Sequence, residues 1–332
     1  MKVFSSFTEA YYDLLLDVYK HPDFVSSPRG QKIREKLGVS FRISNPLDRL
    51  PYVEQRDFSL SYFVAESLWY LSGNDSTEWI SNYSSFWKNI SDDGTTANSA
   101  YGARIFNPHS RIAGQIDPSW TQWDYILNEL TTDPDSRRAV VHIRSPQDSI
   151  LASKDVPCTL SLQFFLRNDQ VHMIVSMRSS DLILGIAYDV PAFTLFQELL
   201  ANQLSDRLNR SISVGEYTHV SNSLHIYEKH FGMVEEILKK REFFSLEMPK
   251  LPKGKLPLEY ILEQESKCRN CQTIDELKQL ASNLNAGSEY WNDWCKILIS
   301  HRANKLKGVD SENFKLVLLK STEFNGYKFF NK

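Results

Sequence analysis

Cys158 stands at a point of the sequence where a thiol is able to act as a nucleophile. It follows Pro157 and comes directly before a short apolar run that is typical of a β-strand. A cysteine at such a junction is accessible enough to attack an electrophile when neighbouring cations stabilise its thiolate. Most free cysteines are instead buried structural residues, so this interpretation depends on the residues that accompany Cys158.

Two groups of charged residues lie about twenty positions on either side of Cys158. The upstream group is Asp135-Ser136-Arg137-Arg138, and the downstream group begins with Arg178-Ser179-Ser180-Asp181. Three guanidinium groups favour an anionic ligand held through bidentate hydrogen bonds, and we expect their charge to lower the pKa of the Cys158 thiol. The Arg137-Arg138 pair on its own is more typical of a solvated turn after a helix.

These residues belong to a longer series of motifs that follow one another in a specific order. In chain order the motifs are Arg29-Gly30, Glu66-Ser67-Leu68-Trp69-Tyr70-Leu71 with Gly73, Trp87, Tyr101-Gly102, Asp133-Pro134-Asp135-Ser136-Arg137-Arg138, Pro157-Cys158, Gln163-Phe164, Arg178-Ser179 with Asp181 and Gly185, and His225 with Tyr227. Through this ordered combination, residues 25 to 235 resemble the thymidylate synthase family. The resemblance implies an α/β (α+β) fold with a mixed sheet flanked by helices.

The resemblance also implies covalent catalysis on a pyrimidine nucleotide. Cys158 would add to C6 and turn C5 into an enamine-like nucleophile, while Glu66 would organise water and move protons around the base. The residues implied to hold the nucleotide are Arg29, Arg178 and Ser179 at the 5′-phosphate, Arg137 and Arg138 from the partner subunit of a homodimer, and His225 and Tyr227 at the sugar 3′-hydroxyl. Ser179 also fits a serine that bonds only the backbone.

The one-carbon donor implied by the resemblance is 5,10-methylenetetrahydrofolate. Trp87, Asp181 and Gly185 are the residues implied to lie against it. Trp87 also fits an ordinary core tryptophan. No metal is expected, because Cys268-Arg269-Asn270-Cys271 is a single CxxC motif and Cys295 with His301 is an unconvincing supply of two further zinc ligands.

Asp189 departs from the synthase pattern at a position that determines the substrate. Synthases carry an asparagine eleven residues after the phosphate arginine, where its amide reads O4 and N3–H of uracil. A carboxylate only accepts hydrogen bonds, so it suits the N4 amino group of cytosine and pairs with N3 when one proton is shared. That proton would also activate the ring toward Cys158. The alternatives are that Asp189 is a surface residue or the N-cap of a helix starting near Pro191.

The sequence therefore predicts hydroxymethylation of CMP or dCMP at C5, with water quenching the exocyclic methylene. Thr159, where synthases usually have histidine, and a chain running about a hundred residues past the family core both weaken the case for hydride transfer. The rival hypotheses are a thymidylate synthase that acts on dUMP, a cytidylate C5-methylase, and a catalytically inactive nucleotide-binding or RNA-binding relative. The choice between CMP and dCMP stays open.

Composition restricts the class of protein around this site. With 38 Lys+Arg against 41 Asp+Glu, the net charge of −3 argues against a nucleic-acid binder, and the apolar runs are too short to span a bilayer. Acidic residues interrupt the apolar start of the chain, which argues against a signal peptide. Four cysteines in 332 residues suggest free thiols. We expect a cytoplasmic enzyme.

Local patterns predict the elements that position these residues. Helices are expected over 8–19, 59–71, 118–130 and 191–204, a loop over 91–99, and strands over 139–143, 160–166 and 171–177 with a hairpin turn at 167–170. The segment 249–257, rich in Pro and Lys, resembles a linker. We therefore expect a catalytic domain over 1–250 and a C-terminal extension over 251–332. The extension is predicted to hold two mainly polar helices and a β-like end over 314–330.

Overall fold

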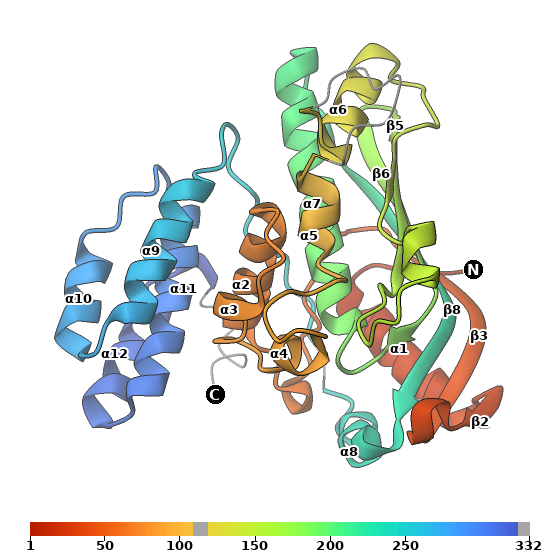
Figure 1. Ribbon diagram of the computed structural model, residues 1–332, viewed down its shortest axis with the longest axis horizontal. Helices are drawn as coiled ribbons and strands as arrows, with labels where there is room; N and C mark the ends of the chain where they lie inside the picture. Colours follow the sequence, from red (N-terminus) through yellow and green to blue (C-terminus); the bar gives the residue numbers. More distant parts are fainter. Residues whose placement is uncertain (109–118, 243, 325–332) are drawn as a thin grey trace.

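The structure is a computed structural model that describes residues 1–108, 119–242 and 244–324 (Figure 1). Eight strands of the described chain form one mixed sheet, whose main path runs in the order β1-β3-β8-β6-β5-β4. The strands are β1 (Lys2–Phe4), β2 (Phe24–Ser26), β3 (Ile33–Ile43), β4 (Val140–His142), β5 (Thr159–Arg167), β6 (Gln170–Met177), β7 (Ser180–Asp181) and β8 (Ser213–Tyr227). The mixed sheet confirms the fold class expected from the resemblance.

The central hairpin of this sheet follows directly from its sequence. Leu162, Phe164 and Leu166 of β5 are buried, while the residues between them are only partly buried, as expected for a strand with one face on the core. Asn168 and Asp169 have positive φ angles of 51° and 57°, which a tight turn between antiparallel strands requires. The predicted strands and hairpin turn are therefore confirmed.

The two longest strands, β3 and β8, escaped the sequence analysis. They pair with each other along nearly their whole length, and β8 also pairs in parallel with β6. Their polar and apolar residues do not alternate cleanly, since neighbouring residues such as Arg34, Glu35 and Lys36 are all partly exposed. Non-local pairing rather than local pattern determines these strands.

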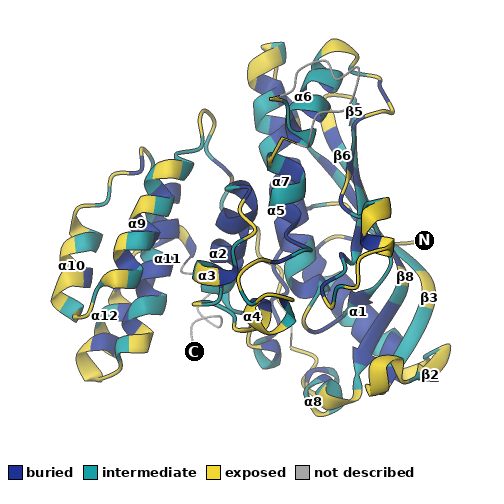
Figure 2. Cartoon of the chain, in the orientation of Figure 1, coloured by how far each residue is buried: buried dark blue, intermediate teal, exposed yellow. Residues whose placement is uncertain are grey.

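Four helices lie on one side of the sheet and bury its core face (Figure 1). They are α1 (Phe7–Lys20), α5 (Tyr101–Phe106), α6 (Gln122–Thr132) and α7 (Ile186–Leu208). Helix α7 packs on β6 and β8 and is buried along most of its length (Figure 2). A second layer contains α2 (Leu60–Leu71), α3 (Thr77–Ile80) and α4 (Phe86–Ile90), with α2 packed on α5 and α7. Helix α8 (Phe231–Lys240) follows β8.

The predicted helices are confirmed with shifted ends. Helix α6 begins at Gln122 because Thr121 and Asp124 form a reciprocal capping box, and residue 118 of the predicted range lies outside the described residues. Helix α7 begins five residues before Pro191, with Gly185 as its N-cap. The 91–99 segment is a loop, in which the Asp93 carboxylate accepts the backbone N–H groups of Thr95 and Thr96.

The described C-terminal part contains four helices instead of the two that we expected. They are α9 (Leu258–Asn270), α10 (Ile274–Ser282), α11 (Glu289–Leu306) and α12 (Val309–Lys320), and they lie together beside α2 (Figure 1). The predicted β-like character is wrong for residues 314–320, which are helical. Phe314 and Leu318 are four residues apart and so lie on one face of the helix, where they pack in a cluster with Ile299. Residues 325–332 lie outside the described residues.

Within the residues that the structure describes, two kinds of feature are absent. No helix there is long and apolar enough to cross a bilayer. No group of three or more His, Cys, Asp or Glu side chains there is arranged to hold a metal ion.

Candidate active site

Cys158 lies at the end of the loop that leads into β5, and Arg178 holds that loop in place. The Arg178 guanidinium donates from Nε to the Pro157 carbonyl at 2.9 Å and from Nη2 to the Val156 carbonyl at 2.8 Å, and its backbone N–H bonds to the Cys158 carbonyl at 2.8 Å. A guanidinium has five N–H donors, so these two side-chain bonds leave donors for an anion. The predicted nucleophile and the predicted phosphate arginine are thus direct neighbours.

The electrostatic setting of the Cys158 thiol differs from our expectation. Burial raises the pKa of Cys158, the positive charges of Arg178 and Arg29 lower it, and the negative charges of Asp189 and Asp155 raise it, with a net upward shift. The expected decrease is therefore wrong, because burial of the thiol outweighs the two arginines, and the carboxylates of Asp189 and Asp155 add to the effect of burial.

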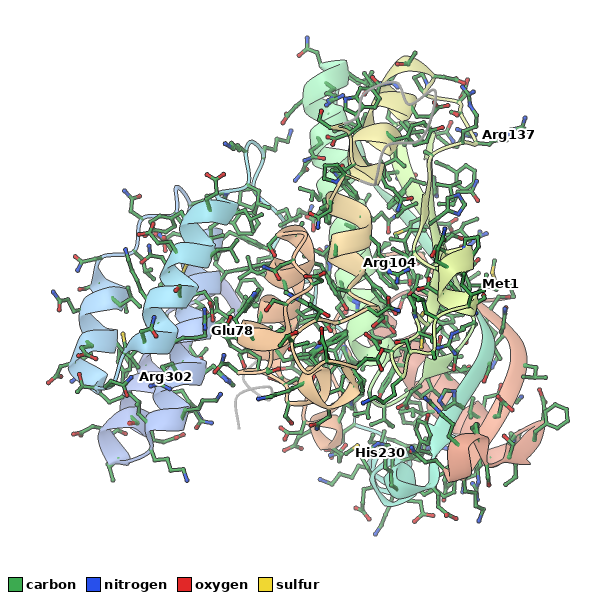
Figure 3. All side chains as sticks on the ribbon, viewed as in Figure 1. Met1, Glu78, Arg104, Arg137, His230 and Arg302 are labelled. Carbon is green, nitrogen blue, oxygen red and sulfur yellow. The ribbon has the colours of Figure 1, made fainter. Side chains whose placement is uncertain are left out.

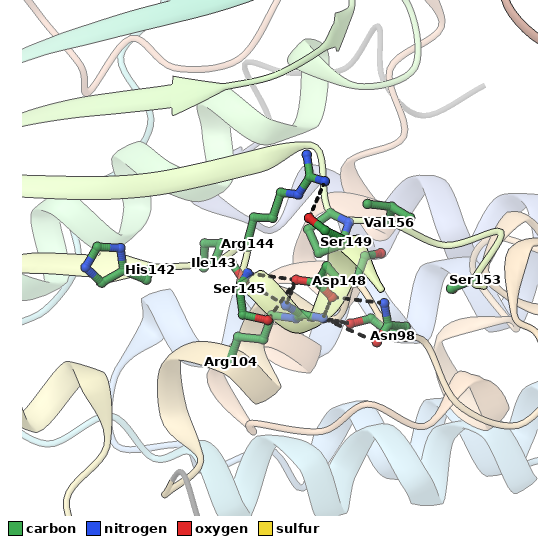
Figure 4. Close-up of polar contacts among 12 residues, drawn as sticks. Asn98, Arg104, His142, Ile143, Arg144, Ser145, Asp148, Ser149, Ser153 and Val156 are labelled. Atoms are coloured by element: carbon green, nitrogen blue, oxygen red, sulfur yellow. Dashed lines mark hydrogen bonds and ion pairs between the residues drawn. The ribbon is translucent and has the colours of Figure 1, made fainter. Parts of the chain in front are cut away.

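A buried polar cluster supports the loop before Cys158 (Figure 4). Arg104 binds both carboxylate oxygens of Asp148, at 2.6 and 2.7 Å, and donates to the carbonyls of Ile143 and Asn98. Burial alone would raise the pKa of Asp148, but the bonds from Arg104 and Ser145 lower it to about 2. The S-x-x-D pattern starting at Ser145 is the local sequence signal of this cluster, because it is typical of a capping box.

The same cluster reaches the residues closest to Cys158. The Asn98 amide donates to the Asp155 carbonyl at 2.8 Å, and the backbone N–H of Ser99 donates to the Asp155 carboxylate at 2.8 Å. Asp155 is thereby anchored three residues before Cys158. The loop that presents the thiol is consequently held from both sides, by Arg178 and by the Arg104 cluster.

Glu66 lies on the buried face of α2 and ends a chain of hydrogen bonds. The Tyr62 hydroxyl donates to Glu66 Oε1 at 2.6 Å and accepts from Trp87 Nε1 at 3.0 Å. Burial raises the pKa of Glu66 to about 8, and the charge of Asp189 adds to this rise against the opposing bond from Tyr62. Glu66 is therefore largely protonated at neutral pH and is able to give a proton to a bound ligand.

Trp87 is buried in an aromatic cluster with Trp69, their ring centroids 4.6 Å apart. This agrees with the core alternative, and the bond to Tyr62 additionally connects Trp87 to Glu66. Its contact with a pterin stays a prediction. Tyr62 itself was missed, and its only sequence signal was its position one helical turn before Glu66.

Asp189 lies in the first turn of α7, close enough for its charge to raise the pKa values of both Glu66 and Cys158. Its backbone N–H donates to the Gly185 carbonyl and Gly185 is the N-cap, so the helix-cap alternative for Asp189 is wrong. Asp189 is partly buried, so it is not a fully exposed surface residue either. Burial raises the pKa of Asp189 to about 7, with a further contribution from the charge of Asp181. The charge of Asp189 in turn raises the pKa values of Tyr101 and Glu66.

Gly185 leaves little room for a side chain beside the Asp181 backbone. A Cβ placed on Gly185 would lie 3.2 Å from the Asp181 carbonyl oxygen, a tight contact, and 3.4 Å from Asp189 Oδ2, an ordinary one. The predicted contact of Gly185 with a cofactor stays a prediction.

The short strand β7 pairs with the end of β8 and brings the predicted sugar residues beside the segment after Arg178. Asp181 pairs with His225 in the sheet, and the His225 and Tyr227 rings meet edge to face with centroids 5.1 Å apart. Burial lowers the pKa of His225. Ser179 directly precedes β7.

Three of the predicted phosphate arginines are exposed. Arg29 sits in a turn over Pro28–Gly30 with a φ of 52°, and its charge reaches Cys158. Arg138 pairs with Glu129 at 2.8 Å, and Arg137 projects outward from the end of the sheet (Figure 3). Both precede β4, whose first residue Val140 already pairs with Gln163, five residues along β5 from Cys158, so the two arginines lie at the far end of this strand pair. Their predicted reach into a partner subunit stays a prediction.

Comparisons with known proteins agree with the geometry of this site. The family model described as thymidylate synthase matches residues 9–262. A deoxyuridylate hydroxymethyltransferase from Bacillus phage SP01 is 33% identical over 250 residues, which cover 74% of this chain and 63% of that relative. The chain therefore spans less than two thirds of the relative's length.

Proposed function

This chain belongs to the thymidylate synthase family, and from that premise we propose that it hydroxymethylates dCMP or CMP at C5. The one-carbon donor is 5,10-methylenetetrahydrofolate, and the product is the 5-hydroxymethyl nucleotide with tetrahydrofolate. The observation that carries this proposal is the placement of Asp189 in the first turn of α7, where its charge acts on both Cys158 and Glu66.

Cys158 supplies the nucleophile. Its sulfur adds to C6 of the pyrimidine, and the electron pair displaced from the C5–C6 double bond makes C5 nucleophilic. With the one-carbon unit attached to C5, loss of the C5 proton would break the bond from that carbon to tetrahydrofolate, which would leave as the free amine. Water would then add to the resulting exocyclic methylene, and the electron pair returned to the ring would break the bond between sulfur and C6. The Arg178 guanidinium binds the loop that carries Cys158. Its charge therefore stabilises the thiolate both before the sulfur adds to C6 and after it leaves C6.

Glu66 supplies the proton transfer. Its pKa of about 8 makes it an acid at neutral pH, so it is able to move protons, directly or through water, around the base as Cys158 adds. The Tyr62 hydroxyl fixes the direction of the Glu66 carboxyl group. Positioned acids of this kind typically contribute about 10²- to 10⁴-fold to a rate.

Asp189 reads the base. Its pKa of about 7 means that one proton is available between this carboxyl group and a base at working pH. The cytosine N4 amino group donates to one oxygen, and N3 shares the proton held at the other oxygen. Protonation at N3 also withdraws electrons from C6, which favours the attack of Cys158.

The residues around the predicted folate position suit a flat, amino-bearing heterocycle. Asp181 provides a carboxylate acceptor, and the neighbouring Leu184 is 47% exposed. Phe86, next to Trp87, is 50% exposed and gives further apolar surface. When bound there, methylenetetrahydrofolate supplies the electrophilic one-carbon unit. Hydroxymethylation is supported by the printed name of the phage relative, which is a hydroxymethyltransferase.

A second candidate function is hydroxymethylation of dUMP. The phage relative is named for deoxyuridylate, and the protonated Asp189 carboxyl group presents one O–H donor and one acceptor, as an asparagine amide does. The acid form therefore matches O4 and N3–H of uracil. The ionised form does not match uracil, because a carboxylate only accepts hydrogen bonds and O4 of uracil is also an acceptor.

A homodimer remains part of the proposal. The sheet face opposite the helices carries partly exposed residues such as Ile174 on β6, and Gln163 of β5 holds the Arg137 carbonyl at the edge of that face. Association through this face would give the exposed Arg137 and Arg138 a route to the nucleotide of the other subunit. Sedimentation of the protein with and without nucleotide tests this part.

The substrate panel tests the whole proposal. The protein is incubated with methylenetetrahydrofolate and either CMP, dCMP or dUMP, and the product is identified by mass while dihydrofolate is followed by absorbance. We expect the 5-hydroxymethyl cytidylate product without dihydrofolate. A 5-methyl product accompanied by dihydrofolate would overturn the hydroxymethylase proposal, and turnover of dUMP alone would favour the second candidate.

A further inference from the structure

The C-terminal extension packs directly on the helix that carries Glu66. Helix α11 contacts α2, and the fully buried Trp294 of α11 meets Phe63 of α2 edge to face with ring centroids 6.4 Å apart. The family match ends at residue 262, inside α9, so α11 lies beyond the matched region. The wall behind the predicted catalytic helix is thus built partly by a segment outside the family core.

One histidine at this contact bridges two segments of the catalytic part. His301 of α11 is 3.1 Å from the Asn82 carbonyl through Nε2 and 3.2 Å from the Ser61 hydroxyl through Nδ1. A carbonyl only accepts, so Nε2 carries the proton and Nδ1 accepts from Ser61. Burial, assisted by the charges of Lys305 and Arg302 and opposed by the bond to Asn82, lowers the pKa of His301 to about 4. The ring is therefore neutral at pH 7.

The contact with Ser61 continues toward both carboxyl groups of the site. Ser61 lies 3.2 Å from the Ser59 hydroxyl, which accepts the backbone N–H of Tyr62 at 3.2 Å. The backbone N–H of Ser59 donates to the Tyr188 hydroxyl at 3.0 Å. Tyr62 and Tyr188 meet edge to face with centroids 4.8 Å apart. Tyr62 binds Glu66, and Tyr188 directly precedes Asp189.

The contact between His301 and Asn82 holds the segment that leads into α4. The Tyr83 ring stacks on His301 with centroids 4.6 Å apart, and its hydroxyl bonds to the buried Glu265 of α9 at 3.0 Å. Lys305 also donates to the Asn82 carbonyl. This segment leads into α4, whose Trp87 donates to Tyr62. The extension therefore holds both segments that meet at the Tyr62 hydroxyl.

We propose that His301 is a positioning residue, which holds the first turn of α2 so that Tyr62 meets Glu66 and Tyr188 stays packed beside Asp189. The proposal rests on the proposed function for the meaning of Glu66 and Asp189, although it does not depend on which pyrimidine is used. Through His301, the C-terminal extension contributes to the geometry of the catalytic residues. His301 acts through other side chains and touches no reacting atom.

The test compares His301→Ala with three matched variants on the best substrate of the panel. We expect His301→Ala to lower kcat roughly 5- to 30-fold, the range of long-range positioning effects, with KM for the nucleotide nearly unchanged. His301→Gln keeps a donor and an acceptor and should recover most of the activity. Ser61→Ala should match His301→Ala, and the double variant should be no worse than either single variant.

Leu277→Ala is the control for a merely weakened extension. Leu277 is fully buried in the other C-terminal cluster, beside Cys268 and Ile299, and has no place at the α2 contact. It should lower thermal stability at least as much as His301→Ala and leave kcat within about twofold. Equal kcat losses in the two variants, or additive losses in the His301/Ser61 double variant, would overturn the proposal.

The pH profile of kcat provides a readout that loss of stability would not move. The groups that shift the pKa of Glu66 are Tyr62, Tyr70 and Asp189, and the bond from Tyr62 lowers it. Losing that bond in His301→Ala should move the alkaline limb of kcat to higher pH, with no such shift in Leu277→Ala. An unshifted limb contradicts the proposal.

Amide hydrogen exchange separates this proposal from the proposed function. Residues 59–66 should exchange faster in His301→Ala than in Leu277→Ala, whether or not any nucleotide turns over. If the unmodified protein acts on no nucleotide of the panel, the proposed function fails. If exchange over residues 59–66 is unchanged in His301→Ala, the positioning role is contradicted, whatever the outcome of the substrate panel.

Discussion

Two regions of this molecule hold cysteines whose pKa values are raised by burial, and only one of them is built for chemistry. Cys158 is surrounded by ionisable groups of both signs, with Arg178 against its loop and the charge of Asp189 acting on it. Cys295 in α11 is buried among apolar helices, and burial raises its pKa to about 12. Burial alone therefore gives an inert thiol, whereas burial beside groups that exchange protons gives a thiol that a ligand is able to activate.

The largest expected effect comes from removing each thiol in turn. Cys158→Ser should lower kcat by roughly 10⁴-fold or more, because no other group described here supplies the nucleophile. Cys295→Ser should keep kcat within about twofold and reduce the free energy of unfolding by about 1–3 kcal/mol, since it leaves a buried hydroxyl to be satisfied. Turnover and denaturant unfolding measure the two quantities. Comparable activity losses would break the contrast between the two regions.

Asp189→Asn should change the substrate preference of the first region by about 100-fold toward dUMP. The amide still pairs with uracil, but it is unable to stabilise a proton on N3 of cytosine, and that proton activates C6. Competition between dCMP and dUMP in one tube, read by mass, measures the ratio of kcat/KM values. A ratio that stays the same would show that Asp189 does not read the base.

Turnover of dCMP should fall as pH rises across the pKa of Asp189. Below about pH 7 the carboxyl group holds the proton that it shares with N3 of cytosine, and above it the ionised form has no proton to share. For a group with this pKa, the protonated fraction falls about tenfold between pH 6 and 8. The kcat/KM for dCMP should therefore fall by up to about tenfold over that range. A kcat/KM for dCMP that rises over this range would contradict the role given to Asp189.

The smallest expected effect concerns the reactivity of the thiols themselves. Asp189 raises the pKa of Cys158, so Asp189→Asn should make alkylation of Cys158 by iodoacetamide a few times faster at pH 7. Labelling of Cys295 and Cys268, followed by peptide mass, should not change. Equal acceleration at all three sites would indicate loosening of the fold instead of a local electrostatic effect.

Much of the fold and the site was predictable where the signal is local. The hairpin of β5 and β6, the Glu66 helix and the buried helix after Gly185 follow from alternation, helical spacing and turn residues in single stretches of chain. Strands β3 and β8 were not, because their stability comes from pairing across more than 170 positions of sequence. Helix α12 was mistaken for a strand because its apolar residues face α11, which no local window contains.

The residue types of the site were determined by the sequence alone, since their order and spacing placed Cys158, Glu66, Arg178 and Asp189 in a single family pattern. Their protonation states were decided only by the tertiary structure. Burial and mutual repulsion raise the pKa of Glu66 to about 8 and that of Asp189 to about 7, and these terms depend on distances between elements that are far apart in the chain. The same holds for His301, whose two ring nitrogens bond to Ser61 and Asn82 only after α11 has packed on α2.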